Sequence, residues 1–123
     1  EEIQADLTKA AEDYSEKYGV IIVLKAAAPV VVRKDEPIYI NSSGCAAMAK
    51  AGSGDVLTGV LAALIAMGME EGQAAVLGVY LHGLAGEAAE KALGENGVLA
   101  RDLADSLADV EREEAVCGRK KRT

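Results

Sequence analysis

The chain opens with a segment of helical periodicity that leads into a short apolar run. Apolar residues recur every three or four positions over residues 2–18, charged residues lie between them, and Gly19 follows. This spacing predicts an amphipathic helix that ends at a glycine. Residues 20–24 read Val-Ile-Ile-Val-Leu without alternation. Such a run predicts a strand buried on both faces, which is typical of a parallel sheet.

Two short β-branched segments come next. Residues 30–32 and 38–40 flank a charged stretch that contains Pro37, and this arrangement predicts a hairpin. Residues 41–54 are small and polar, with several glycines, so they predict a loop.

Three further helical patterns complete the chain. Residues 55–67 and residues 71–93 both show helical spacing, and the longer of the two is apolar on nearly every face, so we expect it to be buried. A final amphipathic pattern runs from Leu99 to Val110. The predicted order is therefore one helix, three strands and three helices.

The segment with the clearest chemistry is residues 51–59, which read Ala-Gly-Ser-Gly-Asp-Val-Leu-Thr-Gly. The first N–H groups of a helix have no internal partner, and the helix dipole is positive there. A glycine-rich entry lets a phosphate approach these groups, so Gly52, Ser53 and Gly54 are predicted to form an anion cradle. Leu57 stands where a dinucleotide fingerprint needs glycine, and the Gly-Lys-Ser/Thr of a Walker A loop is absent.

Asp55 follows the predicted cradle directly, and two interpretations are open. It is either a carboxylate that caps or begins a helix, or a group that orients a hydroxyl and accepts its proton during phosphoryl transfer. A carboxylate is a weak base at its ordinary pKa of about 3.9. A loose transition state eases this difficulty, because the nucleophile then loses its proton late.

Charge and hydropathy exclude some classes of function. The net charge of −7 argues against a nucleic-acid partner, which requires a basic face. Residues 119–123, of which 119–122 are basic, are predicted to be a disordered tail, with contact to a nucleic acid or an anionic surface as the alternative. No apolar run is long enough for a bilayer, so no membrane partner is expected.

The chain has few residues of the types that bind metals. Cys45 and Cys117 have no zinc-site spacing, and the chain has one histidine, His82. We therefore assign no metal ligands, interpret both cysteines as free thiols and expect a cytoplasmic location. Cys45 is interpreted as a small filler and His82 as a packing residue. The chain begins with Glu-Glu rather than Met, which suggests a fragment.

Taken with its flanks, the glycine-rich segment resembles a known family. Gly-Ser-Gly-Asp-Val-Leu-Thr-Gly is similar to the signature of the ADP-dependent NAD(P)H-hydrate dehydratases, in their C-terminal carbohydrate-kinase-like domain. The resemblance extends to about Val110. The flanking residues that share it are Tyr39-Ile40-Asn41, Met48-Ala49, Leu81-His82-Gly83-Leu84-Ala85-Gly86, Gly97-Val98-Leu99-Ala100 and Asp102-Leu103.

This resemblance implies a fold and a reaction. The fold is ribokinase-like α/β, with a mostly parallel central sheet and helices on both faces, and residues 1–123 are roughly its C-terminal half. The reaction repairs hydrated NADH or NADPH. ADP or ATP phosphorylates the hydroxyl group of the hydrate, Mg²⁺ assists, and loss of phosphate restores the reduced nicotinamide ring.

The resemblance also implies roles for individual residues. Asp55 would contact the hydroxyl group of the hydrate as the catalytic base, while the N–H groups of Gly52, Ser53 and Gly54 hold the phosphoryl group. The turn after the first strand would bind the AMP part of the nucleotide, together with Gly54. The residues of this turn are Lys25, Ala26, Ala27, Ala28 and Pro29.

The chain departs from the family pattern in that turn and before the signature. The family reads Lys-Gly-x-x-Thr where this chain has Ala26 and Pro29 in place of the glycine and the threonine. Lys50 is either an extra phosphate contact or a solvated lysine. Two other functions stay open: a ribokinase-like kinase for a vitamin-precursor alcohol, and a catalytically silent nucleotide-binding fragment.

The length of the chain raises a further expectation. A family domain has about twice this length, and its N-terminal part supplies further strands. We therefore expect residues 1–123 to be marginal as a monomer and to pair with the missing half or with a second copy, because the apolar strand at 20–24 would otherwise have an open edge.

Overall fold

The computed structural model describes the backbone of residues 2–120 and the side chains of residues 2–112. The predicted order of one helix, three strands and three helices is confirmed. The basic tail at 119–123 lies outside the residues whose side chains are described, and its disorder stays a prediction. The elements are α1 (Glu2–Tyr18), β1 (Ile22–Leu24), β2 (Val30–Val32), β3 (Tyr39–Ile40), η1 (Ala46–Met48), α2 (Ser53–Ala66), α3 (Glu71–Leu93), η2 (Glu95–Gly97) and α4 (Ala100–Lys120).

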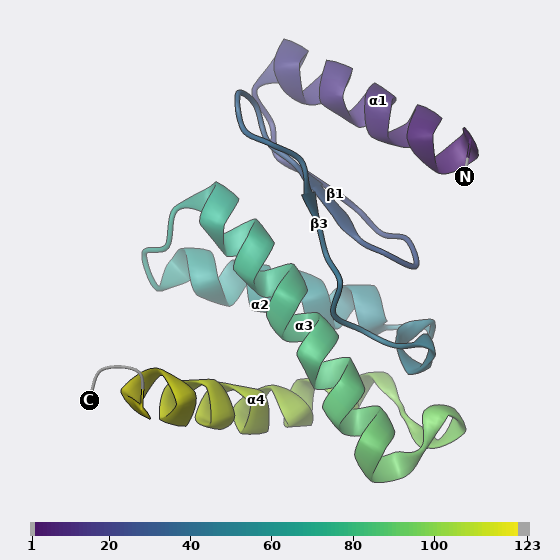
Figure 1. Cartoon of the computed structure of the whole chain (residues 1–123), viewed down its shortest axis with the longest axis vertical. Helices are drawn as coiled ribbons and strands as arrows, with labels where there is room; N and C mark the ends of the chain where they lie inside the picture. The colour runs from purple at the N-terminus through teal and green to yellow at the C-terminus, as the bar shows by residue number, and fades with distance from the viewer. Residues whose placement is uncertain (1, 121–123) are drawn as a thin grey trace.

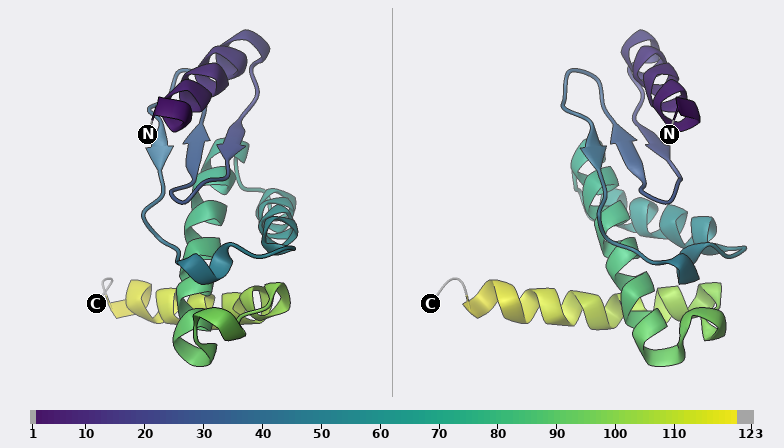
Figure 2. Two further views of the ribbon diagram at one scale, coloured as in Figure 1. Left: turned by 90° about the vertical axis from the view of Figure 1, so that its right-hand side faces the viewer. Right: turned by 45° about the vertical axis from the view of Figure 1, so that its right-hand side comes forward.

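The small sheet lies between α1 on one face and the α2–α3 pair on the other (Figures 1 and 2). Its strand order is β1-β2-β3, so β2 is central. Successive side chains of a strand point to opposite faces. Accordingly Val31 packs in a cluster with Leu57 and Val79, whereas Val30 and Val32 pack on the other face in a cluster with Ala11 of α1.

The α/β class is confirmed, but the expectation for residues 20–24 is wrong in three respects. β1 begins at Ile22, is only half-buried and pairs antiparallel with β2, with Leu24 opposite Val30. Residues 25–29 are too short a connection for a parallel neighbour, which requires a crossover of about a dozen residues or more. All three residues of β2 are buried, so β2 is the strand covered on both faces. The three strands that this chain contributes are all antiparallel.

The hairpin predicted between residues 30–32 and 38–40 is confirmed. β2 and β3 pair antiparallel, with Val31 opposite Tyr39. Asp35 has a φ of 59°, a left-handed conformation that aspartate tolerates better than most residues. The charged stretch is therefore a tight turn at the end of the hairpin.

Helix α3 is the long central helix, which reaches from the sheet to α4 (Figure 1). It crosses the sheet layer at one end and packs against α4 at the other, and α4 extends away from it (Figure 1). As expected from its apolar sequence, α3 buries much of its surface. At Gly83 and Gly86 the loop that precedes α2 comes so close that a β-carbon would collide with Ser43 or Met48. These glycines let the loop lie directly on the helix.

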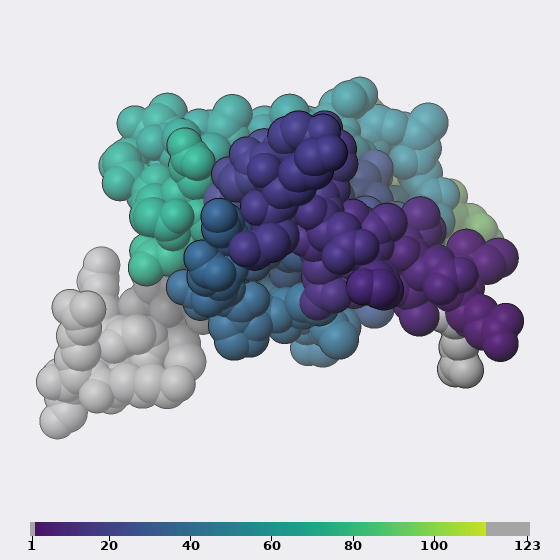
Figure 3. Space-filling model, turned by 90° about the horizontal axis from the view of Figure 1, so that it is seen from above, coloured from purple at the N-terminus to yellow at the C-terminus, as the bar shows by residue number. Residues whose placement is uncertain are grey.

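At the end of the molecule away from α4, helix α1 is largely exposed to solvent (Figure 1). Helix α1 lies across the outer surface (Figure 3), and the large apolar side chains Ile3, Leu7, Tyr14 and Tyr18 are exposed on it. Only Ala11 and Ser15 of α1 are buried. No helix in the described part of the chain is both long enough and apolar enough to cross a membrane.

Candidate functional site

The glycine-rich segment enters α2 through a left-handed residue. Gly52 is the N-cap with a φ of 89°, a conformation that side chains disfavour, and the helix begins at Ser53. The helix therefore starts two residues earlier than the sequence pattern predicted. Asp55 lies in its first turn and is not the N-cap, and no side chain caps this end.

The three amides predicted to hold an anion differ in their availability. The Ser53 N–H donates to the carbonyl of Lys50 at 3.2 Å. The N–H groups of Gly52 and Gly54 have no backbone acceptor among the described residues. The Gly52 carbonyl accepts from Asp55 and Val56, as expected at a helix start. Two of the three predicted donors are therefore open to a ligand.

The ammonium group of Lys25 lies against this helix start. A β-carbon placed on Gly54 would collide with the Lys25 Nζ atom. Glycine at position 54 thus leaves room for a cation beside an available amide. A positive charge and an N–H donor at one point form a suitable contact for a phosphate oxygen.

A cavity of about 720 Å³ lies beside the helix start, lined by Lys25 and Ser53 but not by Gly52 or Gly54. The only charged side chains in its lining are Lys25 and Lys50, and no aspartate or glutamate lines it. The chain as a whole carries a net charge of −7, so the cavity has the opposite sign to the rest of the molecule. This distribution favours an anionic ligand.

The turn between β1 and β2 forms one wall of the cavity. Four of its five predicted nucleotide-binding residues line the space, namely Lys25, Ala26, Ala27 and Pro29, whereas Ala28 does not. The structure therefore brings this turn to the same cavity as Ser53 and Lys50.

Asp55 is placed differently. Its side chain is exposed, does not line the cavity, and makes no hydrogen bond or ion pair with the described residues. Asp55 is not the cap, because Gly52 is, but it is the first-turn carboxylate that one of the two interpretations allowed. The carboxylate has no structural partner here, and its catalytic role stays a prediction.

His82 of α3 lies beneath the cradle and lines the cavity. It is 5% exposed, and its Nε2 atom is 3.0 Å from the Ser53 carbonyl oxygen and 3.4 Å from the Ser53 hydroxyl. Burial lowers the pKa of the His82 imidazole, and the Lys25 charge adds to this, while the hydrogen bond to Ser53 opposes it. As expected, His82 is a packed and hydrogen-bonded residue.

Sequence reasoning missed two polar residues of the cavity, Asn41 and Ser43. The Asn41 side chain, 2% exposed, accepts from the Tyr39 hydroxyl and donates to Ser43 and to the Val79 carbonyl. The Ser43 hydroxyl in turn donates to the Tyr80 carbonyl at 3.0 Å. An asparagine directly after a strand, before a loop of small residues, was the signal that the sequence offered.

Cys45 also lines the cavity, as an unoxidised thiol. Burial raises its pKa, and the Glu90 carboxylate contributes to the rise. A protonated thiol is a poor nucleophile, which agrees with its interpretation as a filler. Among the described residues, no three His, Cys, Asp or Glu side chains gather closely enough to hold a metal ion.

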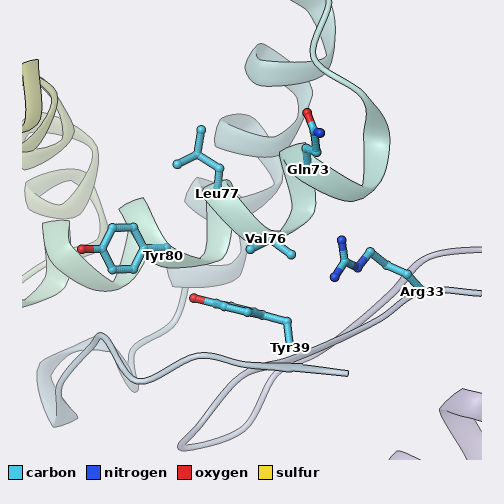
Figure 4. Close-up of a pocket in the computed structure, with 6 residues that line it drawn as sticks. All are labelled: Arg33, Tyr39, Gln73, Val76, Leu77 and Tyr80. Atoms are coloured by element: carbon cyan, nitrogen blue, oxygen red, sulfur yellow. The ribbon is translucent and has the colours of Figure 1, made fainter. Parts of the chain in front are cut away.

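A second, shallower depression of about 280 Å³ lies between β3 and one face of α3 (Figure 4). The Tyr39 ring lies along it, with Arg33 near one end and Tyr80 near the other. It shares no lining residue with the larger cavity, so it is a separate feature.

Comparison with known proteins identifies the family of this chain. The carbohydrate-kinase family model described as NAD(P)H-hydrate dehydratase matches residues 1–109. The bifunctional NAD(P)H-hydrate repair enzyme Nnr of Moorella thermoacetica is 44% identical over 105 residues, which are 85% of this chain and 20% of that protein. The ADP-dependent (S)-NAD(P)H-hydrate dehydratase of Neisseria meningitidis is 39% identical over 104 residues, which are 84% of this chain and 35% of that protein.

A solved structure gives the same result. The ADP/ATP-dependent NAD(P)H-hydrate dehydratase from Bacillus subtilis, co-crystallized with ATP and Mg²⁺, superposes with a TM-score of 0.80 at 31% identity. The match covers 90% of this chain and 40% of that one. The chain thus spans a fifth to two fifths of the length of these relatives. It belongs to the NAD(P)H-hydrate dehydratase family and has the ribokinase-like fold of that family.

Proposed function

We propose that this chain supplies the nucleotide-phosphate wall of an enzyme that dehydrates hydrated NADH or NADPH. The observation that supports this most is the cavity beside α2. Its charged lining consists of Lys25 and Lys50 alone, and two available glycine amides lie at the helix start, where Gly54 approaches Lys25. An acidic chain that concentrates cations at one cavity, next to the N-terminal end of a helix, is suited to a polyphosphate.

The nucleotide lies along the turn at residues 25–29, with its terminal phosphate at the cradle. The Lys25 ammonium and the Gly54 amide contact the transferred phosphoryl group, and Ala26, Ala27 and Pro29 flank the AMP part. Proline has no N–H to offer. This turn therefore binds the nucleotide with fewer polar contacts than the Lys-Gly-x-x-Thr of the family pattern.

Asp55 orients the hydroxyl group of the hydrate and takes its proton late in the transfer. Its carboxylate has no hydrogen bond or ion pair with the described residues, so it is free to contact a substrate. Because its side chain is exposed in this chain, a water-excluded site requires cover from elsewhere. The relatives contain additional chain beyond the matched region, and we assign the cover to that part or to a second copy.

The reaction then balances in two steps. The terminal phosphoryl group of the nucleotide, ADP or ATP, moves to the hydroxyl oxygen of the hydrate. The ring C–O bond next breaks with phosphate as the leaving group, and loss of a proton from the adjacent ring carbon restores the reduced ring. With ADP the by-products are AMP and phosphate.

Mg²⁺ fits this site as an ion that is bound mainly by the nucleotide. Magnesium commonly keeps several waters and uses one or two carboxylates together with substrate phosphates. The described residues offer no cluster of acidic ligands, and Asp55 is the carboxylate within the cradle segment. When bound, the ion would neutralise charge on the phosphates.

A cytoplasmic location remains a prediction.

A nucleotide-binding role without turnover is the second candidate, because Asp55 is exposed and the 25–29 turn departs from the family pattern. One assay separates the two. The full-length gene product is incubated with NADH hydrate and ADP or ATP, and the return of dihydronicotinamide absorbance is followed. Dehydration that Asp55→Ala slows by about 10²-fold or more supports catalysis. Nucleotide binding without dehydration by the unsubstituted protein favours the second role.

A further inference from the structure

We propose that His82 is a positioning residue that aims the Gly54 amide at the bound phosphate. This inference rests on the proposed function only where it concerns phosphate. Its structural part, the control of one peptide plane by one imidazole, stands on the geometry of α3 and the start of α2.

The hydrogen bond defines the state of the ring. Nε2 of His82 lies 3.0 Å from the carbonyl oxygen of Ser53, and a carbonyl can only accept. Nε2 therefore carries the proton. The same N–H also faces the Ser53 hydroxyl at 3.4 Å, so both contacts of the ring are with one residue.

The bonded carbonyl belongs to the peptide unit that joins Ser53 to Gly54. A peptide unit is planar and trans, so its C=O and N–H point in opposite directions. Ser53 and Gly54 already belong to α2, and the bond to His82 anchors the Ser53 oxygen from outside that helix, so it adds a restraint on the direction of the Gly54 N–H, the available donor beside Lys25. Donation to the carbonyl also polarises the unit, which strengthens the N–H as a donor.

The imidazole is itself held firmly. His82 is buried on α3, and the next residue, Gly83, lies so close to the loop that a β-carbon there would be 2.8 Å from the Ser43 carbonyl carbon. Two residues earlier, the Tyr80 carbonyl accepts from the Ser43 hydroxyl. The ring is therefore carried by a helix that is packed against the cavity wall and hydrogen-bonded to it.

A mere packing role would be served by an apolar side chain of similar size. His82 instead contributes a donor to a buried carbonyl, and the Ser53 N–H at the other end of the same residue is fixed by Lys50. Both ends of Ser53 are thus anchored, while the amide that follows it is left open. This pattern is suited to presenting one donor in a defined direction.

The experiment uses ¹⁵N relaxation of the 123-residue chain and compares three variants. In the unsubstituted chain we expect a Gly54 backbone order parameter of about 0.85, the value of rigid backbone. In His82→Leu it should fall measurably, because one restraint on the first turn of α2 is lost, whereas His82→Gln, which keeps a donor, should stay near the original value. Val110→Ala, a buried substitution between α3 and α4, is the control for general loss of stability and should leave Gly54 unchanged.

A second arm uses inorganic pyrophosphate as the probe. We expect His82→Leu to weaken its binding about tenfold and to reduce the shift of the Gly54 amide proton, with His82→Gln retaining both. Absence of dehydratase activity in the full-length protein would overturn the proposed function alone, because the relaxation and pyrophosphate results do not depend on it.

Two results would overturn the positioning role. One is a Gly54 order parameter that is the same in His82→Leu as in the original chain. The other is the tautomer of His82, which is measured on the unsubstituted chain and therefore remains available if His82→Leu does not fold. His82 is the only histidine of the chain, so its ring nitrogens can be assigned without ambiguity. An imidazole with the proton on Nδ1 rather than Nε2 would contradict the hydrogen bond on which the inference depends.

Discussion

The two ends of this molecule are built differently. At the cavity, the loop before α2 is fixed to α3 by side-chain hydrogen bonds from Asn41 and Ser43 to the carbonyls of Val79 and Tyr80. At the other end, α1 leaves a stripe of large apolar side chains exposed, with Ile3 at 78% and Leu7 at 55%. The ion pair that α1 forms, between Lys9 and Asp13, is itself exposed.

The two ends differ in how much of their surface is already packed or hydrogen-bonded within this chain. At the cavity end the side chains of Asn41 and Ser43 are hydrogen-bonded to α3, which helps to hold the cradle in one geometry. The α1 end exposes apolar surface of the kind that marks an interface. Since the chain spans only part of its relatives, we attribute that surface to contact with additional chain or with a second copy.

The largest effect on stability should come from truncating the buried leucine of the cavity end. Leu103 is fully buried beside η1 and α3, so Leu103→Ala should lower the free energy of unfolding by about 2–5 kcal/mol. The matched change at the exposed end, Leu7→Ala, should stay within about 0.5 kcal/mol. Urea unfolding measures both, and equal losses would contradict the contrast.

A smaller effect is expected at the close approach of the loop to α3. Gly83→Ala places a β-carbon against the backbone of Ser43 and should cost about 1–3 kcal/mol. Gly59→Ala is the control, because a β-carbon there meets nothing within 4 Å. That change lies inside α2 and should stabilise by about 0.5–1 kcal/mol. Thermal unfolding of the two variants should shift in opposite directions.

The free energy of unfolding should depend on pH through His82. Its folded-state pKa is lower than its unfolded one, so the unfolded chain binds the proton more readily. The stability that depends on neutral His82 is complete above the unfolded pKa of about 6.5, and it is lost as the pH falls from there through the folded pKa. Unfolding in urea between about pH 8 and 5 should show this loss, and His82→Gln should reduce it. The same pH profile in both proteins would contradict the assignment.

The smallest change in stability, within about 0.5 kcal/mol, is expected for Ile3→Ser combined with Leu7→Ser. Its effect should appear in association instead. Sedimentation of the unsubstituted chain should show self-association through the exposed stripe, and the double variant should reduce it. A monodisperse 12.7 kDa monomer in the unsubstituted chain would contradict the view that α1 is an unfinished interface.

The sequence predicted the elements well, because the helical periods and the glycines that end them act locally. It failed on the pairing of β1, where the unbroken apolar run was given more weight than the short connection at 25–29. The start of α2 was misplaced because the left-handed Gly52 already ends the loop. The bonds from Asn41 and Ser43 to α3 span 38 and 37 positions of sequence, so no local pattern predicts them.

The most direct test of the phosphate cradle is a titration of the ¹⁵N-labelled chain with ADP, followed by amide chemical shifts. We expect the Gly52 and Gly54 amide protons to move most, and Lys25→Ala to weaken the binding about tenfold or more, as loss of a charged hydrogen bond implies. Shifts confined to α1 or to the depression around Tyr39, or an affinity for ADP that Lys25→Ala leaves unchanged, would contradict an anion site at the start of α2.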